Sequence, residues 1–152
     1  MSTLALDLGT KTGWAWGDGA GTVMSGVWDF HTKRHENPGM RYLRFAQELE
    51  KLNATLRPKE VYFEEVRRHA GTSAAHVYGG FKSHLEAFCS LRDIPYASIP
   101  VPVIKRSWTG KGNANKEHMT AEAVRRGYEP TDDNEADALA ILHCALKSGR
   151  AT

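Results

Sequence analysis

The sequence has little cysteine and no long hydrophobic run. Only two of its 152 residues are cysteines, Cys89 and Cys144, and neither has a second cysteine at CxxC spacing. This excludes a disulfide-stapled scaffold and a cysteine zinc site, and it is typical of a reducing cytoplasm. The longest mostly apolar run, residues 138–146, is far shorter than the roughly 20 residues of a membrane-spanning helix. We therefore expect a cytoplasmic protein with no membrane partner.

Several signals of targeting and catalysis are also missing. No signal-peptide pattern follows Met1, and no repeat or low-complexity linker interrupts the chain. Neither a GxSxG nucleophile motif nor a Walker phosphate loop occurs, and His143 and Cys144 are adjacent, which is not zinc-ligand spacing. Hydrophobic residues make up 41% and charged residues 25%, close to the averages for globular proteins. Residues 1–152 are therefore expected to form a single folded domain.

Hydrophobic periodicity predicts an α/β fold. Short apolar or alternating segments indicate strands, and longer segments with apolar residues three or four apart indicate helices. We expect strands at 3–8, 13–16, 22–30, 60–65 and 95–100, with a glycine-rich turn at 9–13, and helices at 37–56, 73–91, 115–126 and 132–147. Three strands followed by alternating helices and strands favour a mixed five-stranded sheet with helices on both faces.

The net charge of +2 hides an uneven distribution. Residues 105–126 contain six lysines and arginines against two glutamates, whereas residues 129–137 contain five acidic residues and no basic one. This pattern is typical of a protein that grips phosphates and also holds cations. Two solvated faces of ordinary helices would give the same pattern, so charge alone does not decide between them.

Three carboxylates stand in apolar surroundings. Asp7 ends a strand whose other residues are apolar, Glu64 ends a second apolar strand, and Asp137 lies in an otherwise core-like helix. Any one of them could be a cap or an ion-pair partner, but three together without matching buried bases favour an oxygen-rich Mg²⁺ or Mn²⁺ site. Asp133 and Asn134 precede Asp137 by four and three residues, so either shares a helix face with it.

Two further residues have a structural and a functional interpretation. Asp132 is expected to cap the last helix, because Glu135 follows three residues later as in a capping box. Trp108, between Arg106 and Lys111, is expected in the core, with stacking on a nucleotide as the alternative.

Four blocks of sequence resemble the RuvC family of Holliday junction resolvases, within the RNase H-like superfamily. They are LALDLGTKTGWAW at the start, VYFEEV at 61–66, VIKRSWTGKGNANKEHM at 103–119 and DDNEADALAILHC at 132–144. The resemblance covers about residues 3–146, and the blocks follow one another in the family's order and spacing. It implies an RNase H-like mixed sheet with helices on both faces.

The resemblance also implies the site residues. Asp7, Glu64 and Asp137 correspond to three of the four family residues that hold two divalent metals, Mg²⁺ with Mn²⁺ as a substitute. The fourth, usually Asp or His, falls on Asn134, so the fourth ligand is Asn134 or Asp133. Lys116 matches a family lysine beside the scissile phosphate and joins the catalytic set. The residues expected to contact DNA are Lys11, Arg67, Arg68, Lys105, Lys111 and Lys116.

The implied activity is metal-dependent cleavage of four-way DNA junctions or other branched DNA by two-metal phosphodiester hydrolysis. Symmetric cutting needs two active sites, so we expect a homodimer, with the helix that begins near Ser73 as the contact surface. Arg67 replaces the aromatic residue with which well-studied resolvases wedge into the junction. Because Asn134 replaces the usual ligand, one alternative function is a non-catalytic module that binds branched DNA. A second alternative is a YqgF-like nuclease acting on RNA, because such nucleases share the first block. DLGTKTG also resembles the phosphate loop of actin-like ATPases, but those need two such lobes, so no nucleotide cofactor is expected.

Overall fold

The computed structural model describes residues 1–147 and contains one mixed sheet. Its five strands lie in the order β3-β2-β1-β4-β5. Their bounds are β1 (Thr3–Asp7), β2 (Lys11–Gly17), β3 (Val23–Asp29), β4 (Glu60–Glu65) and β5 (Tyr96–Pro100). The first three strands pair antiparallel, whereas β4 runs parallel to both β1 and β5. The mixed five-stranded sheet expected from the sequence is therefore confirmed.

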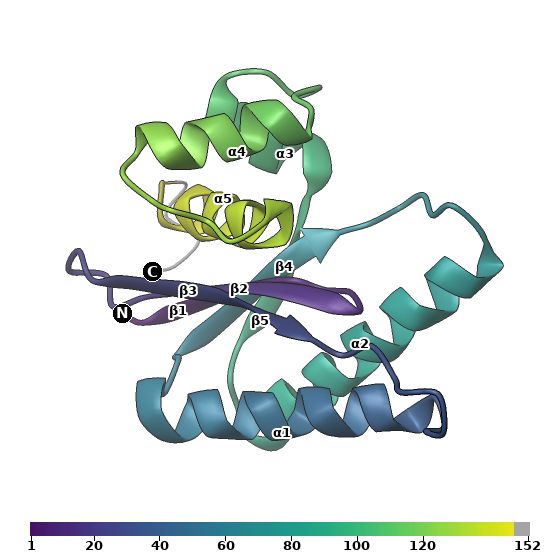
Figure 1. Cartoon of the computed structure of the whole chain (residues 1–152). Coiled ribbons are helices and arrows are strands. Elements are labelled where there is room, and N and C mark those ends of the chain that lie inside the picture. Colours follow the sequence, from purple (N-terminus) through teal and green to yellow (C-terminus); the bar gives the residue numbers. More distant parts are fainter. Residues whose placement is uncertain (148–152) are drawn as a thin grey trace.

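Helices cover both faces of this sheet (Figure 1). Two long helices, α1 (Gly39–Leu56) and α2 (Thr72–Leu91), pack on one face. Three others, α3 (Val101–Thr109), α4 (Lys116–Arg125) and α5 (Asp133–Lys147), pack on the opposite face. Within residues 1–147 no helix combines the length and the apolar character needed to cross a membrane.

Strand alternation divides the core between the two faces. Leu4 and Leu6 of β1 belong to the core under α1 and α2, whereas Ala5 between them belongs to the core under α5. The α5 face of the central strands carries small residues, among them Ala5 and Ala15. Small side chains there let α5 lie directly on the sheet, and its apolar side chains are buried against it.

Gly13 marks the closest approach of α5 to the sheet. A Cβ atom built on Gly13 would lie 1.9 Å from the backbone oxygen of Asn134, where no side chain fits. Gly13 also pairs with Asp7, the last residue of β1. The glycine therefore fixes the beginning of α5 beside the end of β1.

A buried carboxylate fastens the same end of α5. Glu135 accepts hydrogen bonds from the Ser25 hydroxyl at 2.6 Å and from the Thr131 N–H at 2.8 Å. Its own N–H donates to Asp132 Oδ1 at 2.9 Å, so the expected cap by Asp132 is confirmed. Side chain and backbone thus tie α5 to β3 and to the preceding loop.

Two local expectations were wrong. The turn after β1 is shorter than residues 9–13, because β2 already begins at Lys11 and pairs with β3 from its first residue. The helix α3 was missed altogether. Pro100 precedes this helix and Pro102 lies in its first turn, a pair of prolines that is also typical of a loop. Proline is nevertheless compatible with the first turn of a helix, and α3 follows β5 without a connecting loop.

We predict that Gly13→Ala lowers the free energy of unfolding by about 3 kcal/mol, because the added methyl group forces α5 away from β2. The control is Gly79→Ala in α2, where a Cβ meets nothing within 4 Å. Alanine there is expected to leave stability unchanged or raise it by up to about 1 kcal/mol. Denaturant unfolding of the two variants measures both effects, and equal midpoints would contradict the proposed close contact.

Candidate functional site

The candidate site lies at the carboxyl ends of β1 and β4, two adjacent parallel strands. Asp7 is the last residue of β1, two residues after Ala5, and Glu64 comes two residues after Tyr62. Ala5 and Tyr62 face the core under α5, so alternation directs Asp7 and Glu64 toward the same helix. Asp137 lies in the second turn of α5, the end of the helix that Gly13 holds against the sheet.

These carboxyl groups interact electrostatically. Burial, together with the charges of Glu64, Asp137, Asp133 and Asp132, raises the pKa of Asp7 well above its usual range. Burial also raises the pKa of Glu64. Burial and the charges of Glu64 and Asp133 raise the pKa of Asp137 to about 7. Several carboxyl groups are therefore buried close together with too little positive charge beside them to neutralise them fully. Such an arrangement is typical of a functional site.

Two lysines from neighbouring helices partly compensate this charge. Lys105 of α3 lowers the pKa of both Glu64 and Asp137, against the stronger effect of burial. Lys116, the first residue of α4, also lowers the pKa of Asp137, and its Nζ lies 3.3 Å from Asp133 Oδ2. The structure thus places Lys105 and Lys116, the two lysines that the resemblance implies, beside these carboxyl groups.

Both candidates for a fourth ligand lie at the start of α5. The Asp133 carboxylate is close enough to raise the pKa of Asp7 and Asp137. The Asn134 side-chain N–H donates to Asp132 Oδ2 at 3.1 Å, which leaves the amide oxygen as the atom that could coordinate a cation. Each can therefore complete an oxygen-only donor set.

The donor chemistry suits a hard divalent cation. Carboxylate and amide oxygens are the ligands preferred by Mg²⁺ and Mn²⁺, and uncompensated negative charge favours their binding. As the side chains stand, no three His, Cys, Asp or Glu residues among residues 1–147 lie close enough together to hold one ion. Coordination by Asp7, Glu64 and Asp137 would need their side chains to approach one another, at the common location that the strands and α5 supply.

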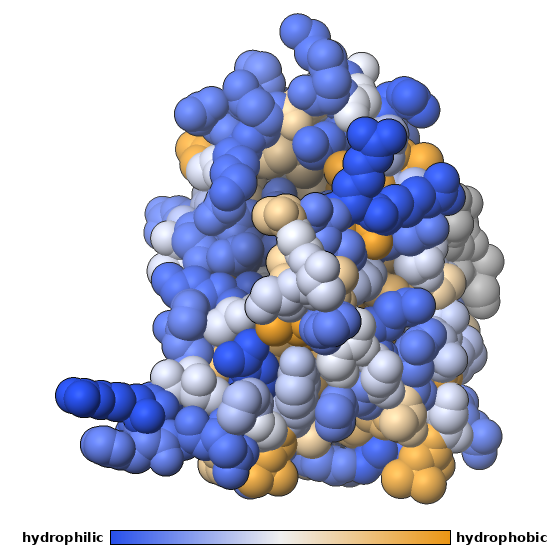
Figure 2. Space-filling view, turned by 90° about the vertical axis from the view of Figure 1, so that its right-hand side faces the viewer, coloured by the Kyte–Doolittle hydropathy of each residue, from blue (hydrophilic) through white to orange (hydrophobic). Residues whose placement is uncertain are grey.

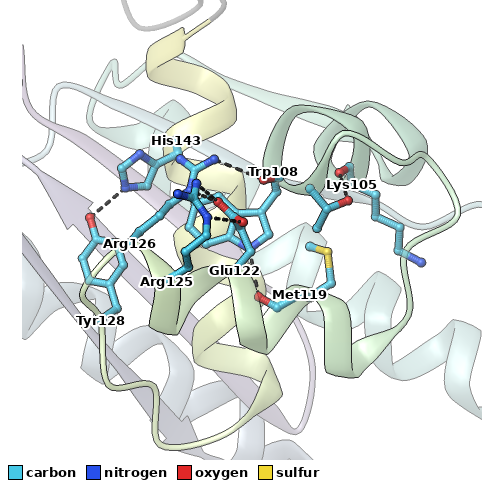
Figure 3. Close-up of polar contacts among 9 residues, drawn as sticks. Lys105, Trp108, Met119, Glu122, Arg125, Arg126, Tyr128 and His143 are labelled. Atoms are coloured by element: carbon cyan, nitrogen blue, oxygen red, sulfur yellow. Dashed lines mark hydrogen bonds and ion pairs between the residues drawn. The ribbon is translucent and has the colours of Figure 1, made fainter.

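A buried tryptophan fixes the two helices that carry the lysines (Figure 3). Trp108 of α3 is 2% exposed, and its Nε1–H donates to the Met119 carbonyl of α4 at 2.9 Å. The Arg126 guanidinium lies 4.0 Å from the centre of the Trp108 ring and bonds Glu122. Trp108 is therefore a core residue, as expected, and the nucleotide-stacking alternative is wrong.

Sequence reasoning missed the arginine and glutamate of this cluster. Glu122 and Arg126 are four residues apart, a spacing that predicts a helical ion pair and was the available signal. The ring of Trp108 also contacts His143 of α5, whose Nε2 lies 2.7 Å from the Tyr128 hydroxyl. These contacts join α3, α4 and α5 into one unit behind the lysines.

The other basic candidates are surface residues. Lys11, Arg68 and Lys111 are exposed, and Arg67 forms a 2.9 Å ion pair with Glu65. Arg67 and Arg68 line a hollow of about 360 Å³ beside the last residue of β5 and the first residues of α3. The side of the molecule toward which β4 points in Figure 1 faces the viewer in Figure 2, and it is mostly hydrophilic with small, separate apolar patches.

Comparisons with known proteins agree with this arrangement. No protein-family model matches the chain. The crossover junction endodeoxyribonuclease RuvC of Anaeromyxobacter sp. (strain K) is 33% identical over 104 residues, 68% of this chain. The matched region is 56% of that relative's length, so the chain spans little more than half of it. RuvC of Pseudothermotoga lettingae is 25% identical over 122 residues, 77% of this chain and 75% of the relative.

The fold comparison covers nearly the whole chain. The structure of Thermus thermophilus RuvC in complex with a Holliday junction substrate superposes with a TM-score of 0.80, at 20% sequence identity, over 99% of this chain and 95% of that one. The mixed sheet with helices on both of its faces has the RNase H-like fold. The sequence relatives narrow this class, and the chain belongs to the RuvC family.

We predict that Asp137→Asn stabilises the protein in EDTA, and more so as the pH rises. The folded-state pKa of Asp137 is raised to about 7, so the wild type loses stability as the pH increases from about 4 to about 7, whereas asparagine does not titrate. At about pH 8 the variant should be more stable by at least about 1 kcal/mol.

Unfolding curves at pH values from about 4 to about 8 test this prediction, with Asp93→Asn as the control. Asp93 is exposed and follows α2 at a left-handed position that asparagine tolerates. If the free energies of unfolding of the wild type and Asp137→Asn changed in parallel with pH, the raised pKa of Asp137 would be contradicted.

Proposed function

We propose that the protein is a structure-selective, divalent-metal-dependent endonuclease that cleaves Holliday junctions or other branched DNA. The observation that carries the proposal is the placement of Asp7, Glu64 and Asp137 at one edge of the sheet, beside Lys105 and Lys116. Family membership supports it, because the relatives are crossover junction endodeoxyribonucleases. The proposal includes action in the cytoplasm and a single domain over residues 1–152.

Asp7, Glu64 and Asp137, with Asn134 or Asp133, would hold two Mg²⁺ ions, which Mn²⁺ can replace. The chemistry that two such cations supply is activation of a water for in-line attack and stabilisation of the leaving 3′ oxygen. The charges of both Glu64 and Asp137 act on Asp7, so Asp7 would belong to the set of carboxylates that holds the two ions. Lys116 would stabilise negative charge on the phosphate at the site.

The basic side chains around the site would hold the DNA backbone. Contacts from lysine and arginine to phosphates fix position and orientation without reading the base sequence. Lys11 begins β2, Arg67 and Arg68 follow β4, Lys105 lies in α3 and Lys111 follows α3. We expect them to contact the DNA backbone on either side of the carboxylates. Arg67 would have to exchange its ion pair with Glu65 for a phosphate contact.

We propose a homodimer, because paired incisions in a four-way junction need two active sites. The contact surface expected from the sequence is the helix that begins near Ser73, which is α2, and part of its small-residue face packs inside the domain. Gly80 packs inside the domain, since a Cβ there would lie 2.4 Å from the Tyr42 ring. Ala74 and Gly79 remain available, Ala74 because it is exposed and Gly79 because a Cβ there meets nothing within 4 Å. Light scattering of the junction complex should give the mass of two chains plus DNA.

Asn134 supports a second candidate, a non-catalytic module that binds branched DNA. An amide supplies a weaker ligand than the carboxylate or imidazole expected at this position, so metal-dependent cleavage is the property that separates the two functions. A YqgF-like nuclease would instead cut RNA, and an RNA substrate distinguishes that alternative.

The test is cleavage of a labelled four-way junction, a linear duplex of matching sequence and a single-stranded RNA, with Mg²⁺ and with EDTA. We expect paired nicks in the junction alone, lost in EDTA. Asp7→Asn is expected to abolish cleavage and to retain junction binding, because the surrounding lysines and arginines are unchanged. Asp93→Asn, remote from the site, serves as the control.

Binding without cleavage by the wild type would favour the non-catalytic module. Cleavage of RNA in preference to DNA would favour the YqgF-like function. Normal turnover by Asp7→Asn would remove Asp7 from the mechanism and contradict the proposal.

A further inference from the structure

A side chain from α2 holds the end of β4. The Tyr78 hydroxyl donates a 2.7 Å hydrogen bond to the backbone carbonyl of Glu64 and accepts a longer one, 3.4 Å, from the Val66 N–H. One phenol therefore bridges the residues on either side of Glu65, where β4 ends and the segment leading to α2 begins.

Glu64 lies where the pairing of β4 with β1 runs out. The register between β1 and β4 ends at the pair Leu6–Phe63, one residue before Glu64. Only the pairing with β1 ends here, because on the other side the pairing with β5 continues through Glu65 and Pro100. The Tyr78 hydroxyl supplies a donor at this point, so it extends the hydrogen bonding of β4 beyond the sheet.

Tyr78 is itself well held. Its ring packs against the core under α1 and α2 and lies 5.2 Å from the ring of His69, centre to centre. Burial, with smaller contributions from the charges of Glu64, Glu65 and Glu86, raises the pKa of Tyr78, so its hydroxyl remains a protonated donor.

We propose that Tyr78 is a positioning residue for the metal site, a proposal that rests on the function proposed above. It fixes the backbone of Glu64 so that the carboxylate stays on the α5 face beside Asp7. It also fixes Val66, the residue before Arg67, and thereby ties the start of the basic segment to the same strand end. Residues that orient a metal ligand from outside the coordination shell affect cation affinity as well as rate.

The test compares Tyr78→Phe with Tyr128→Phe, in metal-stripped full-length protein without DNA. Tyr128 is a matched control, because its hydroxyl makes a contact of the same 2.7 Å length, with His143 behind α4. We expect Tyr78→Phe to weaken Mn²⁺ binding about tenfold in calorimetry, while Tyr128→Phe binds as the wild type does. Junction binding in EDTA should be the same for all three proteins.

A second measurement requires no metal, and its decisive result comes from the wild type. The Val66 amide should exchange slowly with deuterium in the wild type, and faster in Tyr78→Phe if that variant is folded. Fast exchange of Val66 in the wild type would show that the hydroxyl does not hold this segment, and it would overturn the proposal.

A role confined to stability predicts a different result. Tyr78→Phe would then melt at a lower temperature but bind Mn²⁺ with wild-type affinity, and this outcome would also overturn the proposal. A wild type that binds Mn²⁺ without cutting junctions would refute the proposed function alone, because the Mn²⁺ affinities of the variants would still decide the role of Tyr78.

Discussion

The direct contact of α5 with β2 at Gly13 is the constraint on which the rest of the structure depends. Because no side chain fits between Gly13 and the Asn134 backbone, the first turns of α5 lie against the sheet at the residue that pairs with Asp7. The small residues of the central strands continue this surface along the helix. A larger residue at position 13 would separate Asp137 from Asp7, and with it the two halves of the acidic site.

That contact has an electrostatic cost, which the neighbouring elements limit. Burial and mutual repulsion raise the pKa values of Asp7 and Asp137, so the folded chain holds charge that would be more stable in water. Lys105 and Lys116 offset part of this cost, and the contacts around Trp108 keep their helices in place. A bound divalent cation would offset the rest of this cost, so the repulsion between the buried carboxylates favours metal binding.

Much of the fold could be predicted from the sequence, because its signals are local. Alternation and helical spacing located the five strands and four of the five helices, and the acidic residues in apolar surroundings indicated the site. The helix α3 escaped because it is short and begins with prolines. The hydrogen bond from Tyr78 to the Glu64 carbonyl and the contacts of Trp108 join residues 11 to 35 positions apart, on different elements. No spacing in the sequence therefore reveals them.

The central claim is that the carboxyl edge of the sheet is a metal site, and anomalous scattering from crystals soaked in Mn²⁺ tests it most directly. The account predicts two peaks between Asp7, Glu64 and Asp137, about 3.5–4 Å apart, with the side chains turned toward them. It also predicts that Asn134 or Asp133 contacts one of the two. Strong Mn²⁺ peaks elsewhere on the protein with none at these carboxylates would contradict it.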